Sequence, residues 1–236
     1  MNALLRALRE DLAARTNPRN QEGAQRFFKE SIRSYGIRMA DVRLLAREYF
    51  RELKASTKEE VFALCEALWA SGMMEEAHIA AFWTQALRKQ FTESDIETFA
   101  RWIDTYVSNW AACDNFCNNT LGAYFEKFPQ QVPVLQQWAR SANRWMRRAS
   151  AAALIAPARK GRFLEESLAI ATLLLRDPDD LVQKAYGWLL KEQCKKNEPA
   201  VYDFIHAHRQ EMPRTALRYA IEKMPAADRV LLMGKQ

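Results

Sequence analysis

Residues 1–16 read MNALLRALREDLAART, and this stretch sets the pattern for nearly the whole chain. Its leucines recur at the spacing of one face of an α-helix. They are Leu4, Leu5, Leu8 and Leu12. Acidic residues at positions 10 and 11 interrupt the apolar run, so we expect an amphipathic first helix and neither a signal peptide nor a transit peptide.

The composition of the 236 residues favours a soluble helical protein. Only 7 Gly and 8 Pro occur, which leaves little material for hairpin turns, while 49% of the residues are hydrophobic and 27% are charged. No apolar run approaches the roughly 20 residues that a membrane-spanning helix needs, so no membrane is expected as a partner. The four cysteines show no disulfide pattern, which favours reduced thiols and a cytoplasmic location.

Helical periodicity continues beyond the first helix, and no six-residue segment alternates as a half-buried strand would. Asn17-Pro18 is typical of a helix start, and Ser56 with Glu59 fits a capping box. The predicted helices cover residues 2–14, 18–34, 39–54, 57–70, 74–89, 93–106, 109–119, 120–127, 131–139, 143–156, 162–175, 179–195, 198–208, 213–223 and 226–233. The short connections predict an all-α fold of stacked helical pairs, an α-solenoid, in a single domain over residues 1–236.

Four residues recur at intervals of 41, 38 and 40: Trp69, Trp110, Arg148 and Trp188. A HEAT-type repeat has a period of roughly 40–47 residues. Four positions make a weak test of a repeat, so the predicted architecture depends mainly on the helices themselves.

The positive charge of the chain is concentrated in residues 138–162, which contain no Asp or Glu. The basic residues there are Arg140, Arg144, Arg147, Arg148, Arg159, Lys160 and Arg162. A solvated helix face is the simple interpretation. Because charge of one sign repels itself when nothing compensates it, we favour a surface for a polyanion, in line with the net charge of +6.

Two further segments stand out. In SNWAACDNFCNNTLG, residues 108–122, Trp110 and Asp114 are four positions apart and share one face if the segment is helical. A core tryptophan with an aspartate at its rim would give the same spacing. In LVQKAYGWLLKE, residues 181–192, Gly187 precedes Trp188 inside a strong helix pattern. A glycine there costs about 1 kcal/mol relative to Ala, so it indicates close packing or the close approach of another group.

These segments, together with NRWMRRASAA at 143–152 and RFFKESIRSYGIRMADVRLLARE at 26–48, resemble the signature segments of the AlkD-like DNA alkylation repair glycosylases. The resemblance extends from about residue 1 to 225. It implies an α-solenoid of HEAT-like repeats that holds duplex DNA in a basic concave groove. It also implies excision of positively charged alkylated purines, such as N7-alkylguanine and N3-alkyladenine.

The resemblance also implies roles for individual residues. Trp110 and Trp188 match the aromatic residues that flank the deoxyribose of the lesion, and Asp114 matches the catalytic carboxylate. Arg148 matches an arginine that contacts phosphate. Phe27 departs from the pattern, because the best-known members have Tyr there, so the aromatic surface is kept and a hydroxyl is lost.

The chemistry of the substrate agrees with these residues. A cationic purine leaves as a neutral base, so its release needs no strong general acid. Positive charge develops on the sugar in an oxocarbenium-like transition state, which a carboxylate such as Asp114 and the faces of indole rings stabilise. No lysine stands where a Schiff base would form, so we expect a monofunctional hydrolase that leaves an abasic site. No cofactor is expected.

Two basic residues outside the motifs are further candidates for DNA contact. Arg43 follows a helix entry where a phosphate would be favoured, and Lys191 lies one turn after Trp188. Both are equally compatible with ordinary surface positions. No metal site is expected, since Cys113 and Cys117 have no further ligands at a suitable spacing and fit helix packing better.

Two alternatives to a glycosylase remain open at this stage. A related solenoid could recognise DNA shape without cleaving it, and the change at Phe27 leaves room for this. A protein-binding helical scaffold would explain the helices but not the basic run. In the glycosylase interpretation the partner is double-stranded DNA containing alkylated bases, and we expect a monomer.

Overall fold

The computed structural model describes residues 3–234. Within this range the fold is all-α, and the pairing of Arg33 with Met73 is an isolated bridge outside any strand. The predicted fold class is therefore confirmed. None of the helices described is both long enough and apolar enough to cross a membrane.

The chain divides into two compact units, Met1–Phe116 and Cys117–Gln236. The first unit contains helices α1 (Ala3–Ala14), α2 (Pro18–Gln25), α3 (Met39–Phe50), α4 (Lys58–Trp69), α5 (Met74–Ala86), α6 (Asp95–Tyr106) and α7 (Trp110–Asn115), with short 3₁₀ turns η1 (Arg51–Leu53) and η2 (Arg88–Gln90). The π-helical segment η3 (Phe116–Leu121) follows α7 directly. The expectation of a single domain remains a prediction.

The second unit continues with α8 (Gly122–Lys127), the 3₁₀ turn η4 (Pro129–Gln131), α9 (Val134–Trp138), α10 (Arg144–Ala152), α11 (Ile155–Ala158), α12 (Leu164–Leu173), α13 (Asp180–His208), α14 (Arg214–Ala220) and α15 (Ala226–Met233). Helix α13 is its centre, because α10, α11, α12 and α14 all pack against it.

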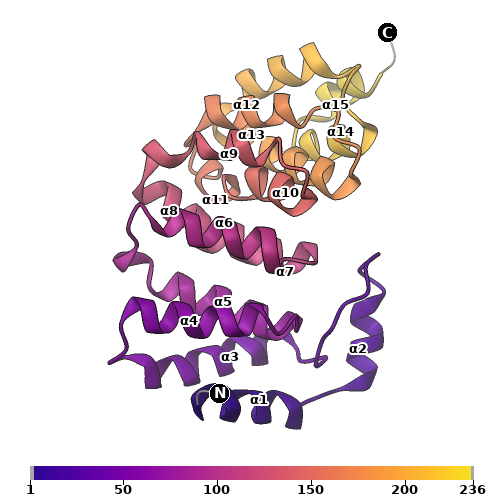
Figure 1. Cartoon of the computed structure of the whole chain (residues 1–236). Helices are drawn as coiled ribbons and strands as arrows, with labels where there is room; N and C mark the ends of the chain where they lie inside the picture. The colour runs from indigo at the N-terminus through magenta and orange to yellow at the C-terminus, as the bar shows by residue number, and fades with distance from the viewer. Residues whose placement is uncertain (1–2, 235–236) are drawn as a thin grey trace. The chain divides into compact units, whose positions relative to one another are not determined.

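In the first unit, α5 has the same central place, with α3, α4 and α7 packed against it (Figure 1). An aromatic cluster fills the space between these helices and α6. The distance between ring centroids is 5.4 Å for Phe62 and Trp102. It is 5.6 Å for Phe116 and Phe99, and 5.4 Å for Phe116 and Trp69. Trp102 is buried in this cluster, and Trp138 and Trp145 are buried in the second unit.

Side-chain caps start several helices. Asn17 caps α2 by accepting the Asn20 backbone N–H, with Pro18 in the first turn as predicted. The predicted capping box lies one residue further along the chain, since Thr57 and Glu60 exchange hydrogen bonds with each other's backbone. Thr57 has the extended backbone that an N-cap residue requires, and α4 therefore starts at Lys58.

The predicted helix 18–34 is wrong beyond residue 25. Helix α2 contains no buried residue, so no apolar face extends it, and the chain turns at residues 26–27. The following segment is held instead by Glu75 of α5, which is 1% exposed. Its carboxylate accepts hydrogen bonds from the Ser34 hydroxyl and from backbone N–H groups at residues 35, 36 and 37. Such side-chain contacts override helix propensity.

Two predicted helices, 179–195 and 198–208, are joined in α13, with a kink at Asn197 just before Pro199. Upstream of the kink, close packing explains the presence of Gly187 inside the helix. A Cβ at this position would lie 2.6 Å from the Ala216 carbonyl oxygen and 2.8 Å from the Tyr219 Cβ atom, both in α14. The glycine is thus required for the close approach of α13 and α14.

Candidate functional site

Trp110 opens α7 and is fixed by the segment that follows α2. Its indole N–H donates to the Phe27 carbonyl oxygen at 3.3 Å. Its ring stacks on Phe28, with 5.1 Å between ring centroids and 20° between planes. Asn109 caps the helix by accepting the Ala112 N–H at 2.9 Å. The orientation of this predicted site residue is therefore set by hydrogen bonding as well as by packing.

Asp114 lies one turn after Trp110 on the same helix, and its side chain is half-buried. Residues at i and i+4 of a helix face the same side, so the structure confirms that α7 presents the indole and the carboxylate together. The indole N–H is directed to the Phe27 carbonyl. The Asp114 carboxylate is thus not the acceptor of the Trp110 indole N–H.

The end of α7 is fixed by a buried histidine. His78 of α5 is 3% exposed, and its Nδ1 lies 3.0 Å from the Asn115 side-chain nitrogen. Burial, reinforced by the charge of Arg43, lowers the pKa of His78 to about 4. The imidazole is therefore neutral at neutral pH, where Nδ1 accepts from the Asn115 amide and no imidazolium is available to act as a general acid.

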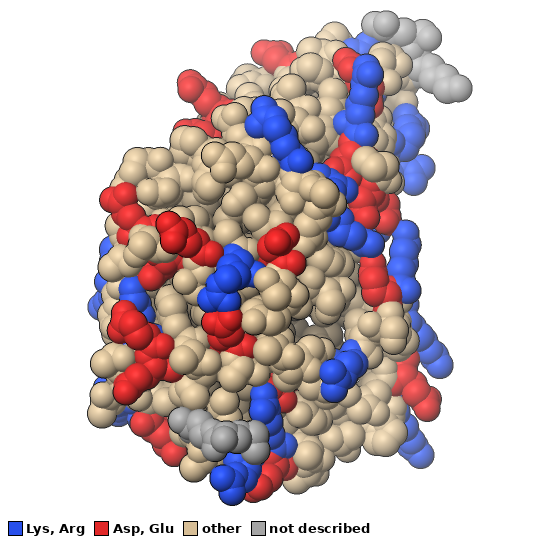
Figure 2. Space-filling view, viewed as in Figure 1, with Lys and Arg blue, Asp and Glu red and all other residues tan. Residues whose placement is uncertain are grey.

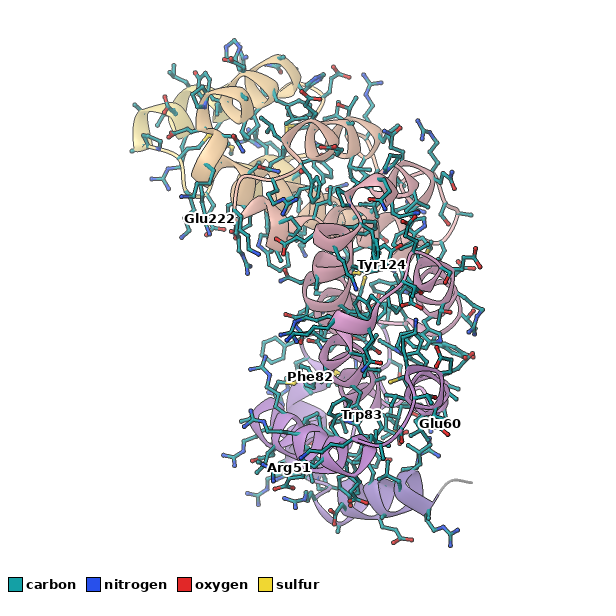
Figure 3. All side chains as sticks on the ribbon, turned by 90° about the vertical axis from the view of Figure 1, so that its left-hand side faces the viewer. Arg51, Glu60, Phe82, Trp83, Tyr124 and Glu222 are labelled. Carbon is teal, nitrogen blue, oxygen red and sulfur yellow. The ribbon has the colours of Figure 1, made fainter. Side chains whose placement is uncertain are left out.

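The exposed predicted residues of the first unit are Phe27 and Arg43. The Phe27 side chain is 77% exposed, which is unusual for a large apolar ring. Arg43 lies on the surface of α3 with its guanidinium 5.6 Å from the ring centre of Phe82. Phe82 and the buried Trp83 are consecutive on α5 and are both labelled in Figure 3.

In the second unit, Trp188 lies half-buried on α13 within a cluster of charged groups. Its indole N–H donates to Glu192 at 3.1 Å, and the Arg159 guanidinium lies 6.0 Å from its ring centre. Glu192 is 5% exposed and forms ion pairs with Arg159 at 3.2 Å and with Lys195 at 2.5 Å.

The pKa of Glu192 reflects these contacts. Burial opposes its ionisation, but hydrogen bonds from Lys195 and Trp188 and the charges of Arg159 and Lys195 outweigh burial and lower the pKa. The carboxylate is thus committed to holding the indole and two cations in place.

The remaining predicted DNA contacts lie in the second unit and are less accessible than expected. Arg148 is 5% exposed, and its guanidinium donates to the Leu181 carbonyl oxygen. Lys191 pairs with Glu222 at 2.9 Å and lies 5.6 Å from the ring centre of Tyr219. Glu222 is labelled in Figure 3.

The interpretation of residues 138–162 as uncompensated positive charge is wrong. Acidic side chains from other segments of the second unit pair with most of the basic residues. The pairs are Arg144–Asp179 at 3.0 Å, Arg147–Asp177 at 2.6 Å, Arg159–Glu192 at 3.2 Å and Lys160–Glu126 at 2.7 Å. Figure 2 likewise shows Lys and Arg side chains beside Asp and Glu over the face in view. Absence of acids in one stretch of sequence does not predict their absence in space.

Four residues of the site were not identified from the sequence: Phe28, His78, Asn115 and Glu192. Glu192 was detectable, because it follows Trp188 at the same spacing as Asp114 follows Trp110. The other three depend on contacts between segments far apart in the chain. Among the residues described, no group of three or more His, Cys, Asp or Glu side chains is arranged to hold a metal ion.

The fold is all-α, and the comparisons with known proteins identify the family. A family model described as DNA alkylation repair enzyme matches residues 8–224, and the chain belongs to this family. Membership implies an enzyme of DNA repair whose partner is DNA.

A solved structure has the same fold. It is described as a predicted DNA alkylation repair enzyme from Enterococcus faecalis. It superposes with a TM-score of 0.79 at 17% sequence identity, over 90% of this chain and 98% of that one. A search of curated proteins finds no significant match.

Proposed function

We propose that the protein is a monofunctional DNA glycosylase that releases positively charged alkylated purines, such as N7-alkylguanine and N3-alkyladenine, from duplex DNA. The observation that carries this proposal is the arrangement on α7. A carboxylate, Asp114, lies one turn from the immobilised indole of Trp110, and the neighbouring His78 is neutral. This set of groups suits a leaving base that already carries a positive charge.

The reaction breaks the bond between the sugar C1′ atom and the purine nitrogen. The bonding electrons leave with the base, which becomes neutral, and positive charge develops on the sugar. Asp114 stabilises this charge and orients a water molecule whose oxygen bonds to C1′ and whose proton is released. The indole face of Trp110 adds attraction for the cationic sugar. The products are the free purine and an abasic site.

The other residues bind the substrate in this proposal. Trp188 supplies a second indole beside the deoxyribose of the lesion, and the Arg159 guanidinium 6.0 Å from its ring centre supports the affinity of this ring for a cation. Phe27 packs its exposed ring against the duplex, and Arg43 and Lys191 contact phosphates. Arg148 adds positive charge from just below the surface. We further propose that the helical pairs are HEAT-like repeats of one domain, with a basic concave groove for DNA, and that the protein acts as a monomer.

The experiment that tests the proposal is incubation with duplex DNA carrying 7-methylguanine and 3-methyladenine, followed by chromatography of the released bases. Release of both bases by the wild-type protein, with intact abasic strands, is the expected result. Salt-dependent duplex binding without release would favour a DNA-shape-binding protein. Absence of both binding and release would favour a protein-binding scaffold.

A further inference from the structure

Phe28 is half-buried and packs against Trp110 of the candidate active site, although its neighbour Phe27 points into solvent. The Phe28 ring lies nearly parallel to the Trp110 indole, with 5.1 Å between centroids, and the preceding peptide accepts the indole N–H. One face and the polar edge of Trp110 are therefore occupied by two consecutive residues. Trp110 is nevertheless only half-buried, so part of its surface remains accessible.

The backbone that carries Phe28 is held by amide side chains of α2. Gln25 donates to the Glu30 carbonyl oxygen at 2.8 Å and accepts the Ile32 N–H at 3.0 Å. Gln21 donates to the Ser34 carbonyl oxygen at 2.7 Å. Helix α2 buries no residue, so these contacts are directed at the course of residues 26–34 and not at a hydrophobic core.

The far end of the same segment is fixed to α5. The buried Glu75 accepts three consecutive backbone N–H groups at residues 35–37, and Gly36 adopts a positive φ of 75° at this point. A Cβ on Gly36 would lie 2.3 Å from the Asn17 carbonyl oxygen, so only glycine fits. Phe28 is thus mounted on a segment that is anchored at both ends.

We propose that Phe28 is a positioning residue that holds the Trp110 indole in the orientation needed at the reacting sugar. Trp110 is the first residue of α7, and its indole is held from outside that helix by the Phe27 carbonyl oxygen and the Phe28 ring. Displacement of a group by about 1 Å can cost on the order of 100-fold in rate. This inference rests on the proposed function, because it assigns the Trp110 indole to the substrate.

Two other roles for Phe28 make different predictions. A residue that only contributes to folding would lower stability without changing the excision rate of the folded protein. A residue that touches DNA itself would act whether or not Trp110 is present. A positioning residue acts through Trp110 alone, so its effect disappears when Trp110 is removed.

The test is a double-mutant cycle on single-turnover release of 3-methyladenine from duplex DNA, at a temperature where each variant is folded. Phe28→Ala should lower the rate about tenfold, with less than a threefold change in Kd for the duplex, and Phe28→Tyr should restore the wild-type rate. In a Trp110→Ala background, Phe28→Ala should change the rate less than twofold. A tenfold loss in both backgrounds would overturn the proposal.

The first unit offers a matched control. Phe50 packs against Trp83 at 6.4 Å, and the Trp83 indole N–H donates to the Ala46 carbonyl oxygen at 2.8 Å. The chemistry resembles that at Trp110, but Trp83 is buried in the core. Phe50→Ala should therefore lower stability and leave the excision rate unchanged. An equal loss of rate in Phe50→Ala would mean that loss of packing, and not the position of Trp110, explains the effect of Phe28→Ala.

A second measurement does not depend on catalysis. Labelling with 5-fluorotryptophan gives a ¹⁹F signal for each of the 7 tryptophans, and Trp110→Phe identifies the signal of Trp110. Phe28→Ala should move this signal, whereas Phe50→Ala should move that of Trp83. An unmoved Trp110 signal would overturn the positioning role. If the wild-type protein releases no alkylated purine, the proposed function fails, and the ¹⁹F result still decides the positioning role.

Discussion

Trp110 and Trp188 share a sequence pattern, a tryptophan followed four residues later by an acid, but the two indoles are held differently. At Trp188 the acid is the anchor, since Glu192 accepts the indole N–H and pairs with Arg159 and Lys195. At Trp110 the anchor is a carbonyl oxygen and a neighbouring ring, and Asp114 is not used for it. One acid is structural, and the other is the candidate for chemistry.

Spacing therefore defines which residues share a helix face but not what each one does there. Glu192 is 5% exposed and lies among cations. Its negative charge is therefore neutralised by Arg159 and Lys195. Asp114 is half-buried beside an indole that neutral groups hold.

Replacing each acid by its amide should separate the two roles most clearly. Asp114→Asn keeps the size of the side chain and removes its charge, so we expect an excision rate on the order of 100- to 1000-fold lower, the loss of about 3 kcal/mol typical of a preorganised electrostatic group. Glu192→Gln keeps an oxygen for the Trp188 N–H and should cost less than about tenfold. Single-turnover release of 7-methylguanine and 3-methyladenine measures both.

Duplex binding should survive Asp114→Asn, because removal of a carboxylate near phosphates relieves repulsion. The loss of rate should also be smaller for the more labile N7 adduct. Equal effects of Asp114→Asn and Glu192→Gln would contradict the assignment of different roles to the two acids, and a wild-type rate in Asp114→Asn would remove the carboxylate from the mechanism.

Acid should affect the two sites in different pH ranges. The pKa of His78 falls from 6.5 to about 4 on folding, so the unfolded chain binds the proton more readily. Stability from this group is complete above pH 6.5 and is lost as the pH falls towards 4, by up to about 3 kcal/mol. Glu192 has its pKa lowered from 4.5, so its contribution is lost only below that value.

Urea unfolding between pH 7 and pH 4 measures the first of these losses. His78→Gln keeps an acceptor for Asn115 without titrating, so it should flatten the curve in this range. His206→Gln, on the surface of α13, is the control and should follow the wild type. A wild-type pH dependence in His78→Gln would show that the end of α7 is not held by the neutral imidazole.

Two glycines test whether the helix of Trp188 is held by close packing. In Gly187→Ala the new methyl group would lie 2.6 Å from the Ala216 carbonyl oxygen, so we expect about 1–3 kcal/mol of strain against a gain of about 1 kcal/mol in helix propensity. In Gly122→Ala the nearest atom, the Ala156 Cβ, is 3.2 Å away, and the change should be close to neutral. Urea midpoints compare the two, and an equally stable Gly187→Ala would contradict the packing explanation.

The smallest effect is expected at Phe27, next to the Trp110 anchor. Phe27→Tyr should bind duplex DNA like the wild type, because the ring is kept. Phe27→Ala should raise the Kd roughly fivefold, about 1 kcal/mol and at the lower end of aromatic stacking on bases. Fluorescence anisotropy with labelled duplex measures both variants. If Phe27→Ala binds as well as the wild type, the exposed ring is peripheral.

Helical periodicity predicted the all-α fold and most helix positions, because core residues such as Leu5, Leu8 and Leu12 repeat at the helical period. It failed after Gln25, where polar groups far away in sequence determine the course of the chain. The same limit applies to the site. The pairing of Trp110 with Asp114 is local to one helix and was predictable, whereas the contacts of Phe28, His78 and the paired arginines are not local.

The burial of the cysteines affects whether the protein is itself modified by the agents that alkylate DNA. Electrophiles that alkylate purine nitrogens also attack thiolates, and thiolate rather than thiol is the reactive form. All four cysteines are buried. Burial raises the pKa of Cys65 to about 12 and that of Cys194 to about 11, which keeps both protonated at neutral pH. These two thiols are thereby protected from alkylation, and this protection should last only as long as the protein stays folded.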